Sequence, residues 1–584
     1  MTASRASRKS FVKRWLAETH GSQFELVRHF LSELLANDLI GSDQVRRLVI
    51  TVLAVVGCIG PLIVRLYIPK YGYLQSLDTG DLYLAAVRAD RLFFISLSML
   101  MAGLVTVLQW HSLFPSRLDY LALKPLPVRL YQVFVARFLS CFLVVAVVTA
   151  DLNLSTSVLF PFLTSGRWQS PPFGVRYIVA HASATFFAGL FAFLAICALQ
   201  GLLMNILSTH LFERVSVVIQ ALLATTLVAA APYVLDVPDW HELIAARPWW
   251  ATLFPPAWFL GLYETLLGVR ESYFGRLCDT AVTRIADALF LALATYFLCY
   301  RRHASRLLEQ ALPTSRGASV VERFASARLG MLLKHAPGRA AFVLALLTLR
   351  RSRRHKFVLG FGIAIALIFT LQTASSGGVA HFRSGESWSA AQLESILAIP
   401  LVISAILISA LCYVFQLPAD VKAGWVFRIA ESTGRRELLA SVECLLILCG
   451  LVPVLLLTAP ILGLLLGWSL ALAHLALVSV LMLLLIEIRL YQWHKIPFTC
   501  SYLPGRRNLW QTLGSYLLLF AALIPTITYF EAQLRPFVLL ASAAAFSVAY
   551  FPLRAARQDR WSLVPLLFDE LDEPLIAAVR LNRE

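Results

Sequence analysis

The sequence predicts an all-α membrane protein that crosses the bilayer many times. Hydrophobic residues make up 59% of the 584 residues and charged residues 15%, whereas soluble domains hold about 45–50% and about 25%. The mean hydropathy is +0.72. The apolar residues also gather in runs of about 20, the length that crosses a bilayer as a helix. Composition and run length together exclude an ordinary soluble protein.

The charge balance predicts a membrane topology rather than a nucleic-acid interface. The formal net charge is +17, but the Lys and Arg residues lie beside apolar runs, and binding to nucleic acid needs a basic face that is clear of lipid. The nine cysteines are scattered along the chain, mostly inside apolar runs. They show neither a disulfide framework nor a CxxC metal pair.

The chain begins with a segment, residues 1–47, that we expect to stay in the cytoplasm. It is basic, but no apolar core with a small-residue cleavage site follows, so a removable signal peptide is not predicted. Within it, Gln23–Arg46 has apolar residues at helical spacing, which predicts an amphipathic helix at the inner membrane interface.

Twelve apolar runs follow as predicted membrane spans. They are Leu48–Ile68, Leu92–Trp110, Val133–Leu154, Tyr177–Leu207, Val215–Leu235, Ala281–Tyr300, Phe357–Ser375, Leu393–Phe415, Leu438–Ile461, Leu470–Leu490, Leu513–Phe530 and Pro536–Leu553. With an inside N-terminus, this count puts most basic clusters in the cytoplasm, as the positive-inside rule requires. Both termini are then cytoplasmic, in a membrane of the bacterial inner (plasma) type.

The connection 301–356 divides the spans into two sets of six, so an internal repeat is predicted. The five regions are a cytoplasmic amphipathic segment (1–47), a first six-span half (48–300), a basic linker with an amphipathic helix (301–356), a second half (357–553) and a cytoplasmic tail (554–584). The alternative is coincidence, since any protein with twelve spans can be cut in half.

Two polar, proline-bearing stretches support the repeat. Leu113–Arg137 lies between the second and third spans, and Leu417–Glu443 lies at the same place in the second half. Each carries a Leu-Pro pair, acids, bases and a stripe of aromatic and aliphatic residues. We interpret both as short amphipathic helices on the cytoplasmic face that a partner protein binds.

The loop before the sixth span differs from its counterpart in the second half. It contains Leu253–Gly268, whose aromatics and prolines suit helices in the outer interface, or an ordinary aromatic belt. The counterpart, Glu531–Arg535, is expected to be only a turn. In the second half, Lys495–Leu509 is expected to form an ordered turn between the tenth and eleventh spans.

Chemistry that the chain itself would perform is not visible in the sequence. No GxxxxGK[ST] phosphate loop is present, so any nucleotide that drives the protein binds to another chain. His241 and Glu242 begin an HExxH pattern, but Ala245 stands where the second histidine would be, which favours a polar loop. We therefore predict no enzyme activity and no catalytic, cofactor-binding or metal site in this chain.

Ionisable residues in or beside apolar runs are further candidates, because a charge in lipid is costly. They are Arg137, Asp151, His181, Arg284, Asp287, Glu443 and Glu487. For most of them, snorkelling at a span end is the ordinary explanation. Arg137 and Glu443 occupy similar places at the starts of the third and ninth spans, and we predict that they pair as an intramembrane polar pair.

The order of these elements resembles the permease subunits of ATP-binding-cassette exporters of the type-2 class. Those permeases have six-span units, an amphipathic helix before the first span, a coupling helix between the second and third spans, and short outer helices before the sixth. The matching stretches here are Gln23–Arg46, Leu113–Arg129, Leu253–Gly268, Val320–Leu349 and Leu417–Glu437. The second half lacks the outer helices.

The resemblance implies a permease that moves a hydrophobic or amphipathic cargo with ATP hydrolysed by a separate ATPase subunit, in two copies. ATP and Mg²⁺ would lie on that partner. One fused chain would form the pathway, or two copies would associate as a homodimer. The coupling residues implied are Leu118, Asp119, Tyr120, Leu121, Lys124, Arg129, Asp420, Lys422, Trp425, Val426, Phe427 and Arg428.

Two other classes stay open. Twelve spans in two halves is also a common plan for ion-coupled secondary transporters, which predicts matched broken helices near the bilayer midplane. A membrane-embedded lipid-modifying enzyme would show clustered carboxylates or histidines at one membrane face, and no such cluster is evident in the sequence.

Overall fold

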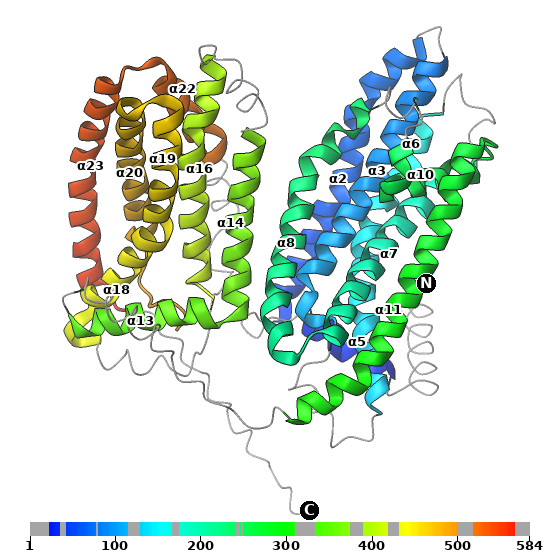
Figure 1. Ribbon diagram of the computed structural model, residues 1–584, viewed down its shortest axis with the longest axis horizontal. Helices are drawn as coiled ribbons and strands as arrows, with labels where there is room; N and C mark the ends of the chain where they lie inside the picture. Colours follow the sequence, from blue (N-terminus) through cyan, green and yellow to red (C-terminus); the bar gives the residue numbers. More distant parts are fainter. Residues whose placement is uncertain are drawn as a thin grey trace, which may run out of the picture. The chain divides into compact units, whose positions relative to one another are not determined.

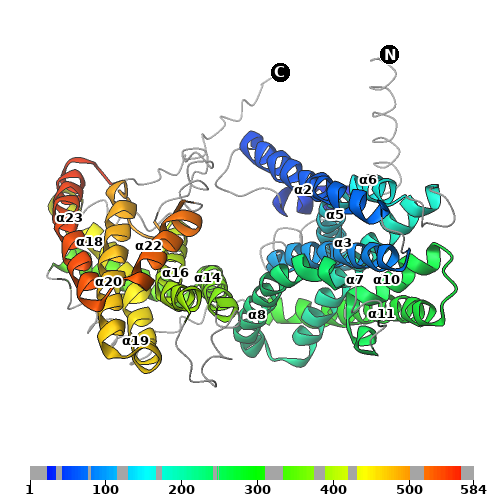
Figure 2. The ribbon, with the colours of Figure 1, turned by 90° about the horizontal axis from the view of Figure 1, so that it is seen from above.

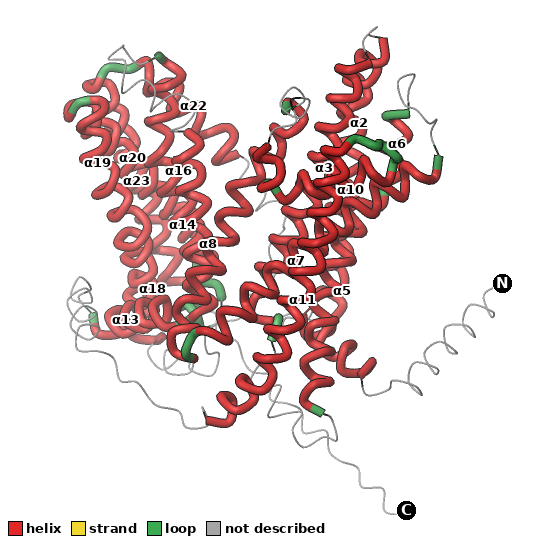
Figure 3. Tube along the Cα trace, turned by 45° about the vertical axis from the view of Figure 1, so that its right-hand side comes forward, coloured by secondary structure: helices red, strands yellow, loops and turns green. Residues whose placement is uncertain are grey.

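The computed structural model describes residues 23–34, 42–76, 80–114, 129–165, 174–240, 246, 249–309, 333, 335–373, 389–417, 431–499 and 518–566. Every regular element in these residues is a helix (Figure 3), so the predicted all-helical class is confirmed. The chain forms two compact units, Met1–Thr314 and Ser315–Glu584. We call them unit 1 and unit 2 and describe each by itself.

Unit 1 is built from long helices joined by short ones (Figure 1). It begins with a helix at 23–34. The elements that follow are α2 (Ser42–Ser76), α3 (Gly80–Leu108), η1 (Trp110–Ser112), α5 (Leu130–Leu154), α6 (Thr156–Leu163), α7 (Val175–Ile206), α8 (Thr209–Asp236), η2 (Val237–Asp239), η3 (Trp249–Leu253), α10 (Pro255–Leu266) and α11 (Ser272–Glu309).

Helix α7 is the centre of unit 1. It contacts α3, α5, α6, α8, α10 and α11, and Figure 2 shows it between α3 and α11. Its buried face carries small residues, among them Ala180, Ala184, Ala188 and Gly189. Such residues let neighbouring helices approach closely, which drives helix association where water is absent.

The short helix α10 is part of this packed bundle. Eight of its twelve residues are buried, including Trp258, Phe259 and Tyr263. A Cβ at Gly261 would lie 2.4 Å from the Cβ of Leu277, so glycine lets α10 lie directly on α11. The helix expected within Leu253–Gly268 is thus confirmed, and protein covers most of it.

Unit 2 contains a second set of helices. They are α13 (Ala336–Arg351), α14 (Arg353–Thr373), α16 (Ala390–Val414), α18 (Glu431–Leu446), the π-helix η6 (Ile447–Leu451), α19 (Val452–Leu466), α20 (Trp468–Tyr491), the π-helix η8 (Leu518–Leu523), α22 (Ile524–Gln533) and α23 (Pro536–Leu563).

The core of unit 2 lies where α16, α18 and α20 meet. Buried Ile408, Leu411, Leu445 and Met482 belong to one apolar cluster there. Helix α20 also packs along α23 and α19. Gly467, with φ +84°, turns the chain between α19 and α20, a conformation that costs other residues more than glycine.

Ten helices in the described residues are long and apolar enough to cross a membrane. They correspond to ten of the predicted spans, and the chain is a multi-pass helical membrane protein. The predicted seventh and eleventh spans coincide with shorter apolar helices, His355–Thr370 and Leu518–Gln533. The count of twelve therefore stays a prediction.

Two predicted boundaries were wrong. Helix α3 begins at Gly80 rather than near Leu92. Glu531 belongs to α22 rather than to a turn. Helix α11 continues to Glu309, but the part of it that is apolar enough to cross a membrane is Ser272–Cys299, which agrees with the predicted end near Tyr300. The connection 301–356 contains α13, in a region where a helix was expected, and the start of α14.

Candidate functional site: the bases of the predicted coupling segments

We call Leu113–Arg129 and Leu417–Glu437 the first and second coupling segments. The structure describes their ends, at 113–114 and 129 and at 417 and 431–437. Eleven of the twelve predicted coupling residues lie outside the described residues, and Arg129 is the exception. Arg129 is the residue before α5, and its backbone N–H donates to Gln132 Oε1 at 2.9 Å.

In unit 1, one side chain of α11 touches both the start of the first coupling segment and the start of α5, which follows the segment. The hydroxyl of Tyr296 lies 3.0 Å from the carbonyl oxygen of Leu113 and 2.9 Å from that of Phe134. Its ring stacks on Phe114 and meets Phe134 edge-on. The first residues of the segment and the start of α5 are therefore held together by a tyrosine 162 positions after Phe134.

A second contact fixes the start of α5 to helix 23–34. Phe30 is fully buried and packs in one cluster with Leu26, Val133 and Ala136. Arg137 Nη1 lies 2.6 Å from Glu33 Oε2, and its guanidinium lies over the Phe30 ring at 4.7 Å. We call Leu113, Phe134, Tyr296, Arg137 and Glu33 the first base.

In unit 2, the entry to the second coupling segment is also fixed from distant parts of the chain. His355 is buried, and its Nε2 lies 3.1 Å from the carbonyl oxygen of Leu417. The N–H of Phe498 donates to the carbonyl of Phe415 at 3.2 Å. The Phe498 ring meets both His355 and Phe415 edge-on, so the described part of the turn predicted at Lys495–Leu509 packs against this entry.

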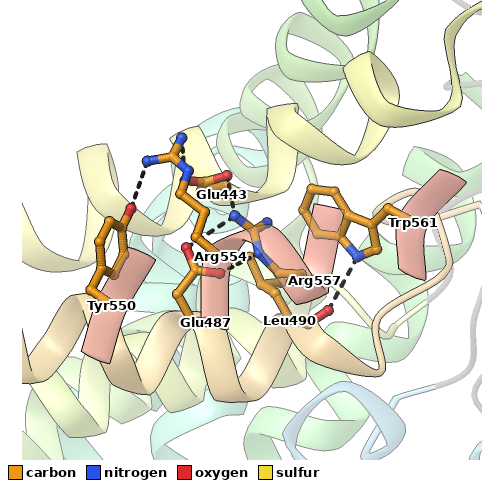
Figure 4. Close-up of polar contacts among 7 residues, drawn as sticks. All are labelled: Glu443, Glu487, Leu490, Tyr550, Arg554, Arg557 and Trp561. Atoms are coloured by element: carbon orange, nitrogen blue, oxygen red, sulfur yellow. Dashed lines mark hydrogen bonds and ion pairs between the residues drawn. The ribbon is translucent and has the colours of Figure 1, made fainter. Parts of the chain in front are cut away.

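The exit of the second segment is held by charges. Arg557 of α23 is fully buried and contacts both Glu487 of α20 and Glu443 of α18 (Figure 4). The distance from Arg557 Nη2 to Glu443 Oε2 is 2.7 Å, and to Glu487 Oε1 it is 3.0 Å. Arg554 adds a contact of 3.3 Å to Glu443 Oε1. Two guanidinium groups thus balance two carboxylates.

Aromatic side chains complete this cluster. The Arg557 guanidinium lies 4.0 Å from the centre of the Trp561 ring, and the Trp561 indole N–H donates to the carbonyl of Leu490 at 3.2 Å. Arg554 donates to the hydroxyl of Tyr550 at 2.6 Å (Figure 4). We call the set His355, Leu417, Phe498, Glu443, Glu487 and Arg557 the second base.

Helix α13 in unit 2 has the role that helix 23–34 has in unit 1. Its buried residues Ala341, Phe342 and Ala345 lie in the core cluster that contains residues of α18. A Cβ at Gly338 would lie 2.6 Å from the carbonyl oxygen of Glu437, so the two helices are in close contact. In each unit, the helix before the first predicted span packs on the helix that follows the coupling segment.

Arg137 and Glu443, which were predicted to pair with each other, each pair with another residue of their own unit. Each side chain has a partner of opposite charge within its own unit, Glu33 for Arg137 and Arg557 for Glu443. Both charges are therefore already balanced locally, and their mutual pairing is not needed to explain their burial.

The other ionisable candidates are scattered. Arg284 and Asp287 form an exposed pair one turn apart on α11, which fits snorkelling at a span end. Asp151 Oδ2 is buried near Gly57 of α2 and has no hydrogen-bond partner among the described residues. His181 is fully buried between the rings of Phe94, Phe160 and Tyr263.

Two ion pairs and one contact between a histidine and a glutamate, all with buried acids, were missed in the sequence. In unit 1, Lys70 pairs with Asp90 at 2.8 Å, and Arg91 pairs with Glu264 at 2.6 Å. In unit 2, His474 Nδ1 lies 3.0 Å from Glu531 Oε2, with both side chains almost fully buried.

One signal in the sequence pointed toward the last pair. His181 is the seventh residue of α7 and His474 is the seventh residue of α20. These helices are the fourth and tenth predicted spans, so the two histidines occupy equivalent places in the predicted repeat. Their surroundings differ, since His181 is enclosed by aromatic rings and His474 faces a carboxylate.

Comparisons with known proteins give no relative. No protein-family model, no curated protein and no solved structure matches the chain. In the described residues, no group of three or more His, Cys, Asp or Glu side chains is arranged to hold a metal ion. The two bases are therefore interpreted from their own geometry.

Proposed function

We propose that this chain is the transmembrane permease subunit of an ATP-binding-cassette exporter. It would move a hydrophobic or amphipathic cargo with ATP hydrolysed by a separate ATPase subunit. The twelve predicted spans would form two six-helix halves, with α14 and the η8–α22 stretch as the seventh and eleventh. Both termini and both coupling segments would face the cytoplasm of a bacterial-type inner membrane.

One observation carries the proposal. The residues at which each coupling segment leaves and rejoins its unit are bound to helices far away in the sequence, by Tyr296 in unit 1 and by His355 and Arg557 in unit 2. A segment that an ATPase moves must pass its displacement to membrane helices through rigid contacts. Fixed bases under two matched segments suit that task.

The proposed chemistry divides between two proteins. Two ATPase subunits would bind ATP and Mg²⁺, and this chain would supply the coupling segments and the path. Leu118, Tyr120, Leu121, Trp425, Val426 and Phe427 would be the apolar anchors in the ATPase groove. Charged residues of the same segments would fix the orientation of the segments in the ATPase groove; they are Asp119, Lys124, Arg129, Asp420, Lys422 and Arg428. Single charges at the rim would add little affinity.

The test is co-purification with candidate ATPase subunits. We expect Tyr120→Ala/Leu121→Ala and Trp425→Ala/Phe427→Ala to release the ATPase without unfolding the permease. The matched control is Trp249→Ala/Leu253→Ala, which removes an exposed aromatic and an exposed leucine from η3 and should leave binding unchanged. If no ATPase binds the wild type, or if binding ignores both segments, the exporter proposal fails.

An ion-driven secondary transporter is the second candidate, and the His474–Glu531 pair favours it. Ionisable side chains buried together in membrane-crossing helices mark ion pathways in transporters. Its test is proton flux into vesicles that contain this chain and no ATPase. Flux that Glu531→Gln abolishes would support the carrier, and no flux would remove it.

A further inference from the structure

We propose that a groove on unit 1, between α5–α6 and α7, binds the acyl chain of a membrane lipid. The groove has a volume of about 510 Å³. One wall comes from the end of α5 and the start of α6, and the other from the N-terminal half of α7. We call it the acyl groove. It lies within unit 1 and involves neither base.

The lining of the acyl groove excludes a charged ligand. None of its lining residues is ionisable. Three of its polar side chains are turned to partners in the protein. Asn153 Nδ2 donates to Ser98 Oγ at 3.0 Å and to the carbonyl of Thr149 at 2.7 Å. Ser157 Oγ donates to the carbonyl of Asn153, and Thr185 Oγ1 to that of His181. The surface that remains is apolar.

The rim of the acyl groove is exposed and apolar. Leu154 is 74% exposed, and Val158, Phe186 and Phe187 are between 37% and 49% exposed. Both walls belong to helices long and apolar enough to cross the membrane, so this rim faces lipid. Ala150 and Ala182 line the groove, one on each wall, and their small side chains leave space between the walls.

The wall formed by α5 and α6 is continuous. Helix α5 ends at Leu154 and α6 begins at Thr156, and Ser155 between them has helical backbone angles, φ −72° and ψ −41°. The carbonyl of Asn153 accepts from both Thr156 Oγ1 and Ser157 Oγ, so these two hydroxyls are bound within the wall.

The shape selects a chain rather than a partner helix. A helix with its side chains is about 10–12 Å across, so a partner helix could place only individual side chains in the groove. A lipid tail is apolar and narrow, and it reaches the rim directly from the bilayer. Lipid around the protein is equally apolar, so close packing rather than the hydrophobic effect would hold the tail.

This inference deepens the proposed function. Only the role of the bound lipid as cargo rests on that function. If the chain is an exporter permease, the acyl groove names the cargo class as lipids with long aliphatic chains, taken up sideways from the bilayer. The binding itself requires no ATPase, so its failure can be told apart from the failure of the exporter proposal.

The test uses the full chain in nanodiscs of phosphatidylcholine that carry a photoreactive diazirine on one acyl chain. Labelled peptides are identified by mass spectrometry. We expect label to concentrate in 149–158 and 178–187. Ala150→Trp and Ala182→Trp, one on each wall, should each lower this labelling about tenfold, the equivalent of about 1.4 kcal/mol. Ala286→Trp, at an exposed alanine of α11, should leave it unchanged.

Thr149→Val distinguishes an acyl chain from a polar ligand in the groove. The Thr149 hydroxyl is buried and has no hydrogen-bond partner among the described residues. Removing it should leave labelling unchanged if the ligand is an acyl chain, and a loss would indicate a polar ligand instead. The proposal is overturned if label spreads evenly over α8 and α11 as well, if both tryptophan variants keep it, or if the groove crosslinks to a second copy of the chain.

Discussion

The first and second bases hold the helices after the two predicted coupling segments, α5 and α18, by different chemistry. In unit 1, the start of α5 is held by a hydroxyl that meets two carbonyls and by one ion pair whose acid, Glu33, is 42% exposed. In unit 2, α18 is held by Arg557, fully buried between two carboxylates. The acid of the first base is therefore partly screened by solvent, whereas in the second base the loss of Arg557 leaves two buried carboxylates.

The comparison teaches that a similar placement of helices does not fix the chemistry inside it. Both units place a helix on the helix that follows the predicted coupling segment. Both carry a buried histidine at the seventh residue of a helix, α7 in unit 1 and α20 in unit 2, which are the fourth and tenth predicted spans. Yet the charged partners differ at each place. If ATP binding to the proposed ATPase moves the coupling segments, we expect the first base in unit 1 to deform more easily than the second base in unit 2.

The largest effect is expected from Arg557→Met. This change leaves Glu443 and Glu487 buried without Arg557, and breaking such a network costs about 3–5 kcal/mol. Thermal unfolding in detergent should show a markedly less stable unit 2. Arg560→Met, an exposed position on the same helix, is the matched control and should have little effect.

A rescue variant sharpens this prediction. Combining Arg557→Met with Glu443→Gln and Glu487→Gln removes the uncompensated charges, so most of the lost stability should return. A triple variant as unstable as Arg557→Met would mean that the arginine acts through packing on Trp561 rather than through its charge.

A smaller effect is expected from Tyr296→Phe. The change removes one hydrogen bond at the first base, worth about 0.5–1.5 kcal/mol, and keeps the ring contacts. Amide hydrogen exchange should speed up in the first turns of α5 and remain as it was in α18. Tyr233→Phe, at a residue that is 60% exposed, is the control, and equal exchange in both variants would contradict the role of Tyr296.

The smallest effect is expected from Glu33→Gln. Arg137 is buried and Glu33 is 42% exposed, so solvent screens the acid, and the glutamine amide oxygen can still accept from the guanidinium. The loss should therefore cost only about 1 kcal/mol. The midpoint of thermal unfolding measures it, with Glu25→Gln, whose side chain is 61% exposed, as the reference. A loss as large as that of Arg557→Met would show that the two bases do not differ as proposed.

The sequence predicts the membrane helices well because their signal is local. Runs of apolar residues are enough to locate ten of them. The start of α3 is missed because its charged residues read as a loop. Their partners make that stretch helical, and Arg91 finds Glu264 173 residues away, a distance that no periodicity reveals.

The bases show the same limit. Arg137, Glu443 and Glu487 are recognisable as charges beside apolar runs, but their true partners are not. Glu33 lies on an amphipathic helix 104 residues earlier, and Arg557 lies 114 residues after Glu443. Tyr296 carries no signal at all, since a tyrosine near a span end is ordinary in an aromatic belt.

The most direct test of the account follows how ATP affects the two bases. Amide hydrogen exchange would be measured on the complex with the proposed ATPase, with and without a non-hydrolysable ATP analogue. We predict that the analogue changes exchange at the starts of both α5 and α18. In Tyr296→Phe, the ATPase should still bind while the change in α5 alone is lost. If neither start responds in the wild type, or if Tyr296→Phe responds as the wild type does, the bases do not transmit the movement.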